Sequence, residues 1–292
     1  MKLTFTILLA TITAWFAVPA QAGPAGTGDS FKGPLGLQLY SLRDQFAKDV
    51  PGTLAKVKEF GFTQVELAGT YGKSPEEFNA LLKANGLTAI AGHFGFERFR
   101  DDPEGVAKEA KALGLQYAGT AWVPHNGPEG APVDEKWVHE TAKVFNQAGE
   151  VLAKHGIKFY YHNHGYEFVP HGDGTLFDLL VKETKPEYVS YQMDVMWAVF
   201  PGQDPAKLMT KHAGRWVLMH VKDLKKGVAT GSLKGGTDTK NDVVIGTGQV
   251  NWPALLAASK KAGVKYYFIE DESPSVLEQI PQSLKYLEQV KF

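Results

Sequence analysis

The segment KHGIKFYYHNH, residues 154–164, shows the pattern that decides the fold: a basic helix end, a glycine, an apolar run and then polar side chains. Lys favours the negative end of a helix dipole, Gly supplies the left-handed residue that ends a helix, and the apolar run is typical of a buried parallel strand. The pattern precedes five other apolar runs, and two further runs complete the set. The eight predicted strands are residues 36–40, 63–67, 88–92, 116–121, 157–161, 188–194, 216–220 and 265–270.

Helical patterns lie between these runs, for example at residues 75–85, 103–113, 138–155 and 253–262, and several open with Pro or with a Ser or Asp cap. Strict alternation of strands and helices predicts a parallel sheet, and eight units predict closure into a (β/α)8 barrel, the TIM barrel. An open doubly wound sheet is the alternative, but no Gly-rich phosphate loop follows the first strand. We therefore expect one TIM-barrel domain over residues 35–292, with a long loop at 225–250 after the seventh strand.

The first 22 residues are typical of a secretory signal peptide. Lys2 gives a short positive region, residues 3–18 are largely apolar, and AQA at residues 20–22 matches the small-x-small cleavage pattern. The apolar run is shorter than the roughly 20 residues that a membrane-spanning helix needs. We expect cleavage near Ala22, a flexible leader over residues 23–34, and a periplasmic or secreted mature protein.

The composition narrows the choice of partners. With 31 basic and 32 acidic residues, no overall field attracts nucleic acid or an anionic membrane. The absence of cysteine excludes disulfides and thiolate ligands, so stability must come from a large core, which 43% hydrophobic residues can supply. We expect a small, uncharged carbohydrate as partner, neither nucleic acid nor membrane after signal cleavage, and a homodimer as the assembly to test.

Polar side chains follow nearly every predicted strand. In a TIM barrel the functional residues lie at the carboxyl ends of the strands. A single His or Asp there is ordinarily a satisfied polar residue or a helix cap, but their coincidence at so many strand ends indicates a site. They are Tyr40, Arg43, Glu66, His93, Trp122, His125, His162, Asn163, His164, Glu167, Asp194, Trp197, His220, Lys222, Asp223, Glu270, Asp271 and Glu272.

A divalent metal would reconcile these groups with one another. Buried carboxylates and imidazoles that face one axis repel or desolvate each other unless a cation compensates them. The last four strands offer His162 or Glu167, then Asp194, His220 and Glu270. Oxygen and nitrogen ligands of this kind suit one Mn, Mg, Co, Zn or Fe ion, and the residue types alone do not choose among these ions.

Six segments carry a resemblance to a known family: GLQLYSLR (36–43), VELA (65–68), YHNHGYEF (161–168), MD (193–194), HVKD (220–223) and IE (269–270). They resemble the sugar phosphate isomerase/epimerase family of xylose-isomerase-like TIM barrels, over essentially the whole mature chain. The resemblance implies a divalent metal held by strand-end Glu, Asp, His and Glu. It also implies isomerisation, epimerisation, dehydration or cleavage of keto sugars and cyclitols. Matched by motif, Asp194, His220 and Glu270 are metal ligands.

The first ligand departs from the family pattern. His162 stands where relatives of the epimerase type carry their first metal-binding Glu, and the nearest acidic residue is Glu167. Either of the two would complete the ligand set. The departure points away from ketose epimerases, which use two metal-bound glutamates as bases. The His-Asn-His-x-x-Glu-Phe signature resembles proteins that act on 3-keto-glycosides or related oxidised sugars.

The expected chemistry is proton abstraction next to a carbonyl. The metal would bind the carbonyl and stabilise the enediolate, and Glu270, His164 or Glu167 would take the proton. Lys222 would contact an anionic oxygen of the substrate or pair with Asp223. Reprotonation gives an epimer or an isomer, whereas loss of a β-leaving group makes the protein a 3-keto-glycoside lyase or hydratase.

Five residues are expected to bind the substrate: Tyr40, Glu66, His93, Trp122 and Trp197. The two tryptophans follow strand ends closely and are candidates for stacking on a pyranose ring. Because sugar phosphates are largely intracellular, an exported protein is expected to act on an unphosphorylated sugar or an oxidised glycoside. A trinuclear-metal nucleic-acid repair barrel is disfavoured by the neutral charge balance, and a non-catalytic sugar-binding barrel by the nearly complete polar ring.

Overall fold

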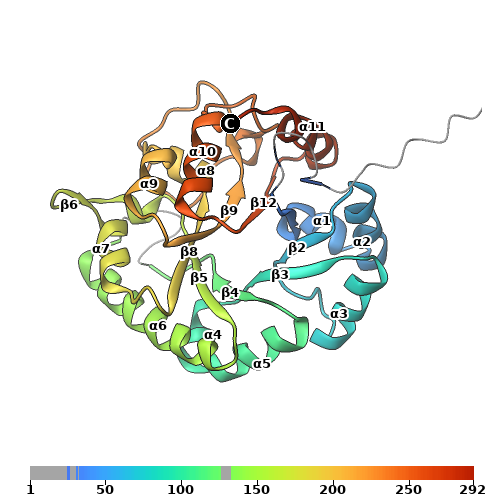
Figure 1. Cartoon of the computed structure of the whole chain (residues 1–292), viewed down its shortest axis with the longest axis horizontal. Coiled ribbons are helices and arrows are strands. Elements are labelled where there is room, and N and C mark those ends of the chain that lie inside the picture. Colours follow the sequence, from blue (N-terminus) through green and yellow to red (C-terminus); the bar gives the residue numbers. More distant parts are fainter. Residues whose placement is uncertain (1–24, 27–30, 32, 126–132) are drawn as a thin grey trace, which may run out of the picture.

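Eight parallel strands form a closed barrel, in the order β1–β12–β9–β8–β5–β4–β3–β2, with helices around it (Figure 1). The computed structural model describes residues 25–26, 31, 33–125 and 133–292. The predicted (β/α)8 barrel is therefore confirmed. Its strands are β1 (Leu35–Gln38), β2 (Gln64–Leu67), β3 (Thr88–His93), β4 (Tyr117–Thr120), β5 (Lys158–His162), β8 (Val189–Asp194), β9 (Trp216–Val221) and β12 (Tyr266–Ile269).

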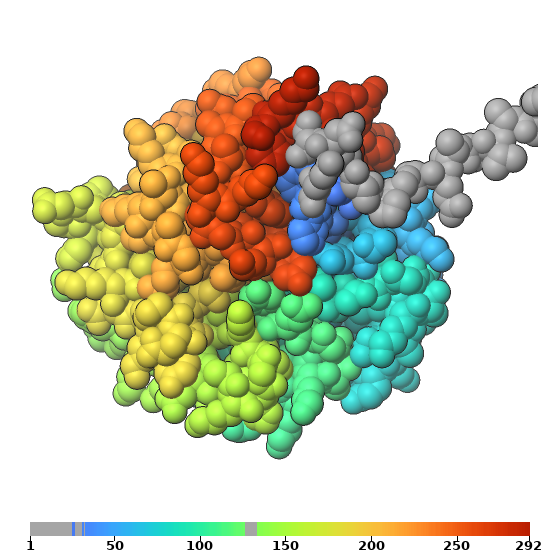
Figure 2. Space-filling model, viewed as in Figure 1, coloured from blue at the N-terminus to red at the C-terminus, as the bar shows by residue number. Residues whose placement is uncertain are grey.

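The barrel closes where the first and last strands pair. Leu35, Gly36 and Leu37 of β1 lie in parallel register with Tyr267, Phe268 and Ile269 of β12. In the space-filling view the blue start and the red end of the chain are accordingly in contact (Figure 2). No strand of the barrel is left with an unpaired edge.

The helices begin and end at the signals that the sequence carries. Ser74 and Glu77 form a reciprocal capping box at the start of α3, and Asp102 accepts a hydrogen bond from Gly105 N at the start of α5. The helices are α1 (Arg43–Phe46), α2 (Val50–Glu59), α3 (Pro75–Ala84), α4 (Phe96–Asp101), α5 (Pro103–Leu113), α6 (Glu135–Lys154), α7 (Leu176–Glu183), α8 (Val195–Val199), α9 (Pro205–Lys211), α10 (Trp252–Ala262) and α11 (Val276–Gln289), with 3-10 turns η1 (Leu39–Leu42), η2 (Tyr166–Phe168) and η3 (Thr239–Asn241).

Two predicted boundaries differ from the structure by more than one residue, each because a side chain bonds the backbone. The first strand ends at Gln38 instead of residue 40, since the Gln38 side chain accepts a hydrogen bond from Tyr40 N and starts η1. Helix α6 starts at Glu135 instead of residue 138, since Asp134 caps it by accepting from Trp137 N.

The predicted loop at 225–250 is largely irregular and is held by a short strand pair and by hydrogen bonds to Asp223. Its short strand β11 (Asp242–Val243) pairs antiparallel with β10 (Asp223–Leu224), and β6 (Pro170–His171) pairs with β7 (Gly174–Thr175) elsewhere. The Asp223 carboxylate accepts hydrogen bonds from Gly246 N, Gly248 N and Trp252 Nε1. These bonds hold the loop over the carboxyl end of the barrel.

The barrel interior changes from apolar to polar along its axis. One layer is an apolar cluster that includes Ile90, Tyr160, Leu218 and Phe268. Gly119 leaves room for the large Tyr160 ring, because a Cβ atom at 119 would lie 2.6 Å from Tyr160 Cδ1. Beyond this layer, toward the strand ends, the buried side chains are Glu66, Gln192, Asp194 and His220. The polar layer forms the floor of the site.

Of the predicted leader, the structure describes Ala25, Gly26, Phe31, Gly33 and Pro34. The Phe31 ring is buried and lies edge-on to Tyr267 at a centroid distance of 5.2 Å, and Gly26 N donates a hydrogen bond to Glu288. These contacts tie the described part of the segment to β12 and α11. The predicted signal peptide, residues 1–22, lies outside the described residues. Within those residues, no helix combines the length and the apolar character needed to cross a bilayer.

Candidate functional site

A cavity of about 510 Å³ opens at the carboxyl end of the barrel strands. Its position is where TIM barrels carry their active sites. Residues that follow each of the eight strands contribute to it, and the loop after β10 covers part of its mouth. The lining is formed by Tyr40, Ala68, His93, Phe94, Gly95, Thr120, Ala121, Trp122, His162, His164, Met196, Trp197, Gly235, Gly236, Thr237, Thr239, Asp242, Glu270 and Glu272.

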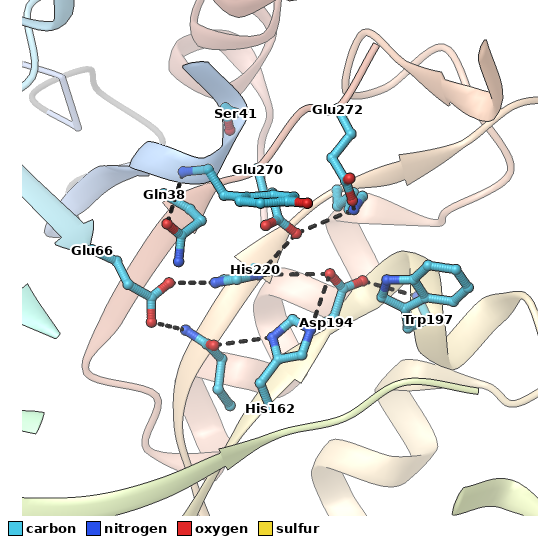
Figure 3. Close-up of polar contacts among 12 residues, drawn as sticks. Gln38, Ser41, Glu66, His162, Asp194, Trp197, His220, Glu270 and Glu272 are labelled. Carbon is cyan, nitrogen blue, oxygen red and sulfur yellow. Dashed lines mark hydrogen bonds and ion pairs between the residues drawn. The ribbon is translucent and has the colours of Figure 1, made fainter. Parts of the chain in front are cut away.

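Three predicted metal ligands meet where the cavity ends, with Glu270 in its lining and Asp194 and His220 buried behind it (Figure 3). Asp194, His220 and Glu270 each offer one donor atom, and these atoms lie within 4.8 Å of one another. His220 Nδ1 lies 3.2 Å from Glu270 Oε2 and 3.6 Å from Asp194 Oδ2. Asp194 Oδ1 caps helix α8 by accepting from Trp197 N, whereas the buried Oδ2 has no hydrogen-bond partner among the described residues. A buried carboxylate oxygen left in this way, beside two further donors, fits a divalent cation.

His162 and Glu167, the two alternatives for a fourth ligand, lie on opposite sides of the barrel wall. His162 Nε2 is 3.9 Å from Asp194 Oδ2, and its ring centroid is 4.6 Å from that of His220. Glu167 instead accepts hydrogen bonds from His164 N and from the hydroxyl of Tyr161, which packs against Phe145 of α6. Successive strand residues point to opposite faces, so Tyr161 and its partner face the helices while His162 faces the interior. The structure thus brings His162, and not Glu167, to the cluster.

Glu66 lies beneath the cluster, in contrast to the prediction that it contacts substrate. Its carboxylate contacts His220 Nε2 and accepts hydrogen bonds from Tyr160 Oη at 2.6 Å and Gln192 Nε2 at 2.8 Å. It is fully buried and is not part of the cavity lining. Burial raises the pKa of Glu66, but the charges of His220 and His93 act in the opposite direction. The net pKa lies below its ordinary value, so the carboxyl is ionised.

Lys222 is buried among three carboxylates. Its Nζ lies 2.5 Å from Glu272 Oε1, 3.1 Å from Glu270 Oε2 and 3.6 Å from Asp242 Oδ2. Burial lowers the pKa of Lys222, but Asp242, Glu270 and Glu272 raise it well above its ordinary value. The predicted alternative of a Lys222–Asp223 pair is wrong, because the Asp223 carboxylate accepts backbone hydrogen bonds from the loop.

Aromatic side chains form the walls of the cavity. Tyr40 and Trp122 are 43% and 41% exposed at its mouth, whereas Trp197 is buried. The His164 ring lies between the two tryptophans, at centroid distances of 5.3 Å from Trp122 and 5.4 Å from Trp197. Burial and the charge of Lys222 lower the pKa of His164 to about 3, so its imidazole is neutral. Its buried Nδ1 has no hydrogen-bond partner in the part of the chain that is described.

Three residues of the site were missed by the sequence reasoning. Gln38 and Gln192 bond the site histidines from below, and Asp242 approaches Lys222 from the long loop. Gln192 had a signal, because it stands two positions before Asp194 and so faces the same side of its strand. Asp242 had none, since its place depends on the β10–β11 pairing between distant residues.

Comparisons with known proteins agree with this fold. The chain is 24% identical over 239 residues to the rhizopine catabolism protein MocC of Rhizobium meliloti, covering 74% of this chain and 72% of that protein. It is 24% identical over 206 residues to the inosose dehydratase of Geobacillus kaustophilus, covering 64% of this chain and 65% of that enzyme, just under two thirds of its length.

Solved structures show the same barrel. A sugar phosphate isomerase/epimerase from Parabacteroides distasonis superposes with a TM-score of 0.69 at 25% identity, covering 95% of this chain and 98% of that one. The family model described as xylose isomerase-like TIM barrel matches residues 54–290. The closed eight-stranded barrel and this match over most of its length show that the chain belongs to the xylose isomerase-like TIM barrel family.

Proposed function

We propose that the protein is a divalent-metal-dependent enzyme that removes a proton next to the carbonyl of a keto sugar or 3-keto-glycoside. The observation that carries the proposal is the buried Asp194–His220–Glu270 cluster, with its unpartnered Asp194 oxygen, at the floor of an aromatic-walled cavity. Relatives that include inosose dehydratases support an enzyme that acts on carbohydrates. They also favour elimination of a β-leaving group over epimerisation or isomerisation after the shared first step.

The ion would be held by Asp194, His220, Glu270 and His162. Two carboxylates and two imidazoles suit Mn, Fe, Co or Zn better than ions that prefer only oxygen. When bound, a divalent ion polarises the substrate carbonyl and stabilises the negative charge that develops on its oxygen. Burial raises the pKa of Glu270, but the charge of Lys222 lowers it, so Lys222 keeps Glu270 ionised for this task.

His164 is the residue best placed to accept the proton from the substrate carbon. It lines the cavity, its imidazole is neutral, and Nδ1 has no other partner among the described residues. The negative charge of the enediolate would offset the positive charge of Lys222. It would therefore raise the pKa of His164 and favour the protonated imidazole. Glu270 is the second candidate, but its Oε2 already faces His220 and Lys222. Returning the proton to the leaving group would complete an elimination.

The cavity is suited to a substrate without a phosphate group. Trp122, Trp197 and Tyr40 offer flat faces for a sugar ring. The charged lining residues that the structure describes are Asp242, Glu270 and Glu272, with neither Lys nor Arg among them. Phosphate recognition relies on free cations or helix N-termini, and the ammonium of Lys222 is already surrounded by carboxylates. The words 'sugar phosphate' in the name of related proteins therefore do not define the substrate of this protein.

The test is elemental analysis of the purified protein, followed by metal-dependent deuterium uptake from heavy water by keto sugars and 3-keto-glycosides. About one divalent ion per chain is expected, with exchange lost in both Asp194→Ala and His220→Ala. Asp204→Ala is a matched surface control, because Asp204 is exposed, caps α9 and pairs with Lys207 far from the site residues in the chain. Retained exchange in both site variants would overturn the proposal. Sugar binding without metal or exchange would instead favour a non-catalytic sugar-binding barrel.

We also propose that the mature protein is exported. The support is the charge, the apolar run and the AQA pattern of residues 1–22. When the full chain is expressed in a bacterial host, the periplasmic fraction should contain a protein that begins at Gly23. An Ala22→Lys variant should stay uncleaved, and an unprocessed wild-type chain in the cytoplasm would contradict export.

A further inference from the structure

We propose that a buried hydrogen-bond network centred on Glu66 and Gln192 fixes which nitrogen of each site histidine faces the metal: Nδ1 of His220 and Nε2 of His162. The inference rests on the metal-dependent function proposed above and adds two positioning residues to it. Neither Glu66 nor Gln192 lines the cavity, so neither touches substrate. Both side chains are fully buried, and both act through the histidines.

The proton on His220 is placed by Glu66. An ionised carboxylate only accepts hydrogen bonds, so the His220 Nε2 that contacts Glu66 Oε2 carries the hydrogen. The other oxygen, Oε1, accepts from Tyr160 and Gln192, which fixes the carboxylate in place. His220 Nδ1 faces Asp194 and Glu270, the two other ligands, so the hydrogen on this nitrogen is the one that a bound ion would displace.

The proton on His162 is placed by Gln192. Because Glu66 cannot donate, Gln192 must present its NH2 group to Glu66, and its carbonyl oxygen therefore faces the other way. That oxygen lies 3.1 Å from His162 Nδ1. An amide oxygen only accepts, so Nδ1 of His162 carries the hydrogen and Nε2 keeps the lone pair. This Nε2 is the atom that lies 3.9 Å from the unpartnered oxygen of Asp194.

The same reasoning excludes His93 as a metal ligand. Its ring centroid is 5.5 Å from that of His162 and 5.8 Å from that of His220, close enough to suggest a three-histidine site. However, its Nε2 must donate to the Gln192 oxygen at 3.2 Å. Its Nδ1 lies 3.5 Å from Gln38 Nε2, which can only donate. With both nitrogens engaged, His93 braces the network and offers no lone pair to an ion.

Carboxylate and amide partners behind metal-binding histidines are known to orient the ring and raise ligand basicity. Their loss generally weakens metal binding about 10-fold to 100-fold. The network therefore explains how a neutral His162 can serve at a position where relatives of the epimerase type carry a Glu. The Gln192 oxygen supplies the acceptor that holds the required tautomer.

The decisive variant is Glu66→Gln. The amide oxygen at 66 is needed by both Tyr160 and Gln192, so the NH2 group faces His220 Nε2 and obliges it to accept. The proton moves to Nδ1, the nitrogen needed for the metal. We expect Mn²⁺ affinity, measured by titration against a chelating dye, to fall about 10-fold to 100-fold. Gln192→Leu, which removes the acceptor behind His162, should lower it in the same range.

The matched control is Glu167→Gln, the same substitution at a buried glutamate that also bonds a tyrosine but lies outside the barrel wall. Its Mn²⁺ affinity should equal that of the wild type. Thermal unfolding of the metal-free variants reports folding separately. If Glu66→Gln does not fold, Gln192→Leu carries the test.

A spectroscopic measurement separates a tautomer effect from simple loosening. Long-range ¹H–¹⁵N spectra of ¹⁵N-histidine-labelled protein with Zn²⁺ should show hydrogen on Nε2 of His220 and on Nδ1 of His162. In Glu66→Gln the His220 pattern should reverse. Failure of the wild type to bind Mn²⁺ or Zn²⁺ would refute the proposed function itself. Normal binding in the wild type, with unchanged affinity and unchanged tautomers in both variants, would refute only this inference.

Discussion

Two consecutive tyrosines of β5 bond buried glutamates on opposite sides of the barrel wall. Tyr160 points inward and donates to Glu66, whereas Tyr161 points outward and donates to Glu167. The inner carboxyl is ionised: burial raises the pKa of Glu66, but the charges of His220 and His93 and the hydrogen bonds of its carboxylate together lower it below its ordinary value. The outer carboxyl has no such cation, and burial raises the pKa of Glu167 to about 7, although hydrogen bonds from Tyr161 and His164 N oppose the rise.

The comparison shows that the same tyrosine–glutamate pair can have different roles in different surroundings. The two pairs are chemically alike and one position apart, but the two-residue period of the strand gives them different neighbours. The inner pair supports the proposed metal site. The outer pair supports the backbone at His164 and, through the Tyr166 hydroxyl, the ring that packs against Trp122 of the wall.

The largest difference between the two sides of the wall should appear when one carboxylate is removed from each side in separate variants. Asp194→Asn keeps the cap on α8 but weakens the ion's binding, and we expect a loss of turnover on the order of 10³-fold together with loss of bound metal. Glu167→Gln should retain the metal and most of the turnover. Metal analysis and kinetics on both proteins check this, and comparable losses in the two variants would break the comparison.

A smaller effect is expected at His164, where the two sides meet. His164→Gln should lower kcat by about 10²-fold, because it removes the proton acceptor, while bound metal stays at the wild-type level. Steady-state kinetics with parallel metal analysis separate the two readouts. Loss of the metal in this variant would show that His164 is a ligand and not a base.

The outer carboxyl predicts a pH dependence of stability. The folded pKa of Glu167, about 7, lies above its ordinary value of 4.5. Its contribution is therefore fully present below about pH 4.5 and is lost as the pH rises through 7. Relative to Glu167→Gln, the wild type should lose about 2 kcal/mol of stability between about pH 5 and about pH 7. Urea unfolding at several pH values measures the difference, and a flat difference would contradict the assignment.

A carboxylate on the outer surface should show the opposite sign and the smallest effect. Burial raises the pKa of Asp178, but hydrogen bonds from His212, Lys211 and Thr175 lower it overall. Its contribution is therefore present above about pH 4 and is lost as the pH falls. Asp178→Ala also removes the capping box of α7 and should cost about 1 kcal/mol at neutral pH. Calorimetry should show that the difference from the wild type shrinks in acid, whereas a constant difference would argue for loss of packing.

The fold was predictable because its signals are local. Each strand is preceded by a Lys-bearing helix end and a glycine, so alternation and strand number follow from the sequence. The meeting of the three proposed metal ligands was predictable for a related reason: parallel strands bring their last residues together whatever the side-chain packing. Asp194, His220 and Glu270 needed only the correct assignment of three strands.

The remaining parts of the site depend on contacts between distant residues. The choice between His162 and Glu167 depends on which face of β5 each reaches, and Glu167 lies beyond the strand end, where the two-residue period no longer applies. The surroundings of Lys222 required Asp242, which only the β10–β11 pairing brings near. The position of Gln192 two residues before Asp194 places it on the site face of its strand, but its residue type does not predict the hydrogen bonds that orient the histidines.

The separation between floor and walls has a consequence for how this barrel can change. The floor consists of strand residues linked to one another by buried hydrogen bonds, whereas Trp122 and Gly235 of the walls belong to the segments after the strands. The wall residue Tyr40 is joined to the floor by its backbone and not by its side chain: its N–H donates a hydrogen bond to the Gln38 side chain. Evolution or a mutant library could therefore exchange wall side chains to recognise new sugars while the catalytic floor is inherited intact.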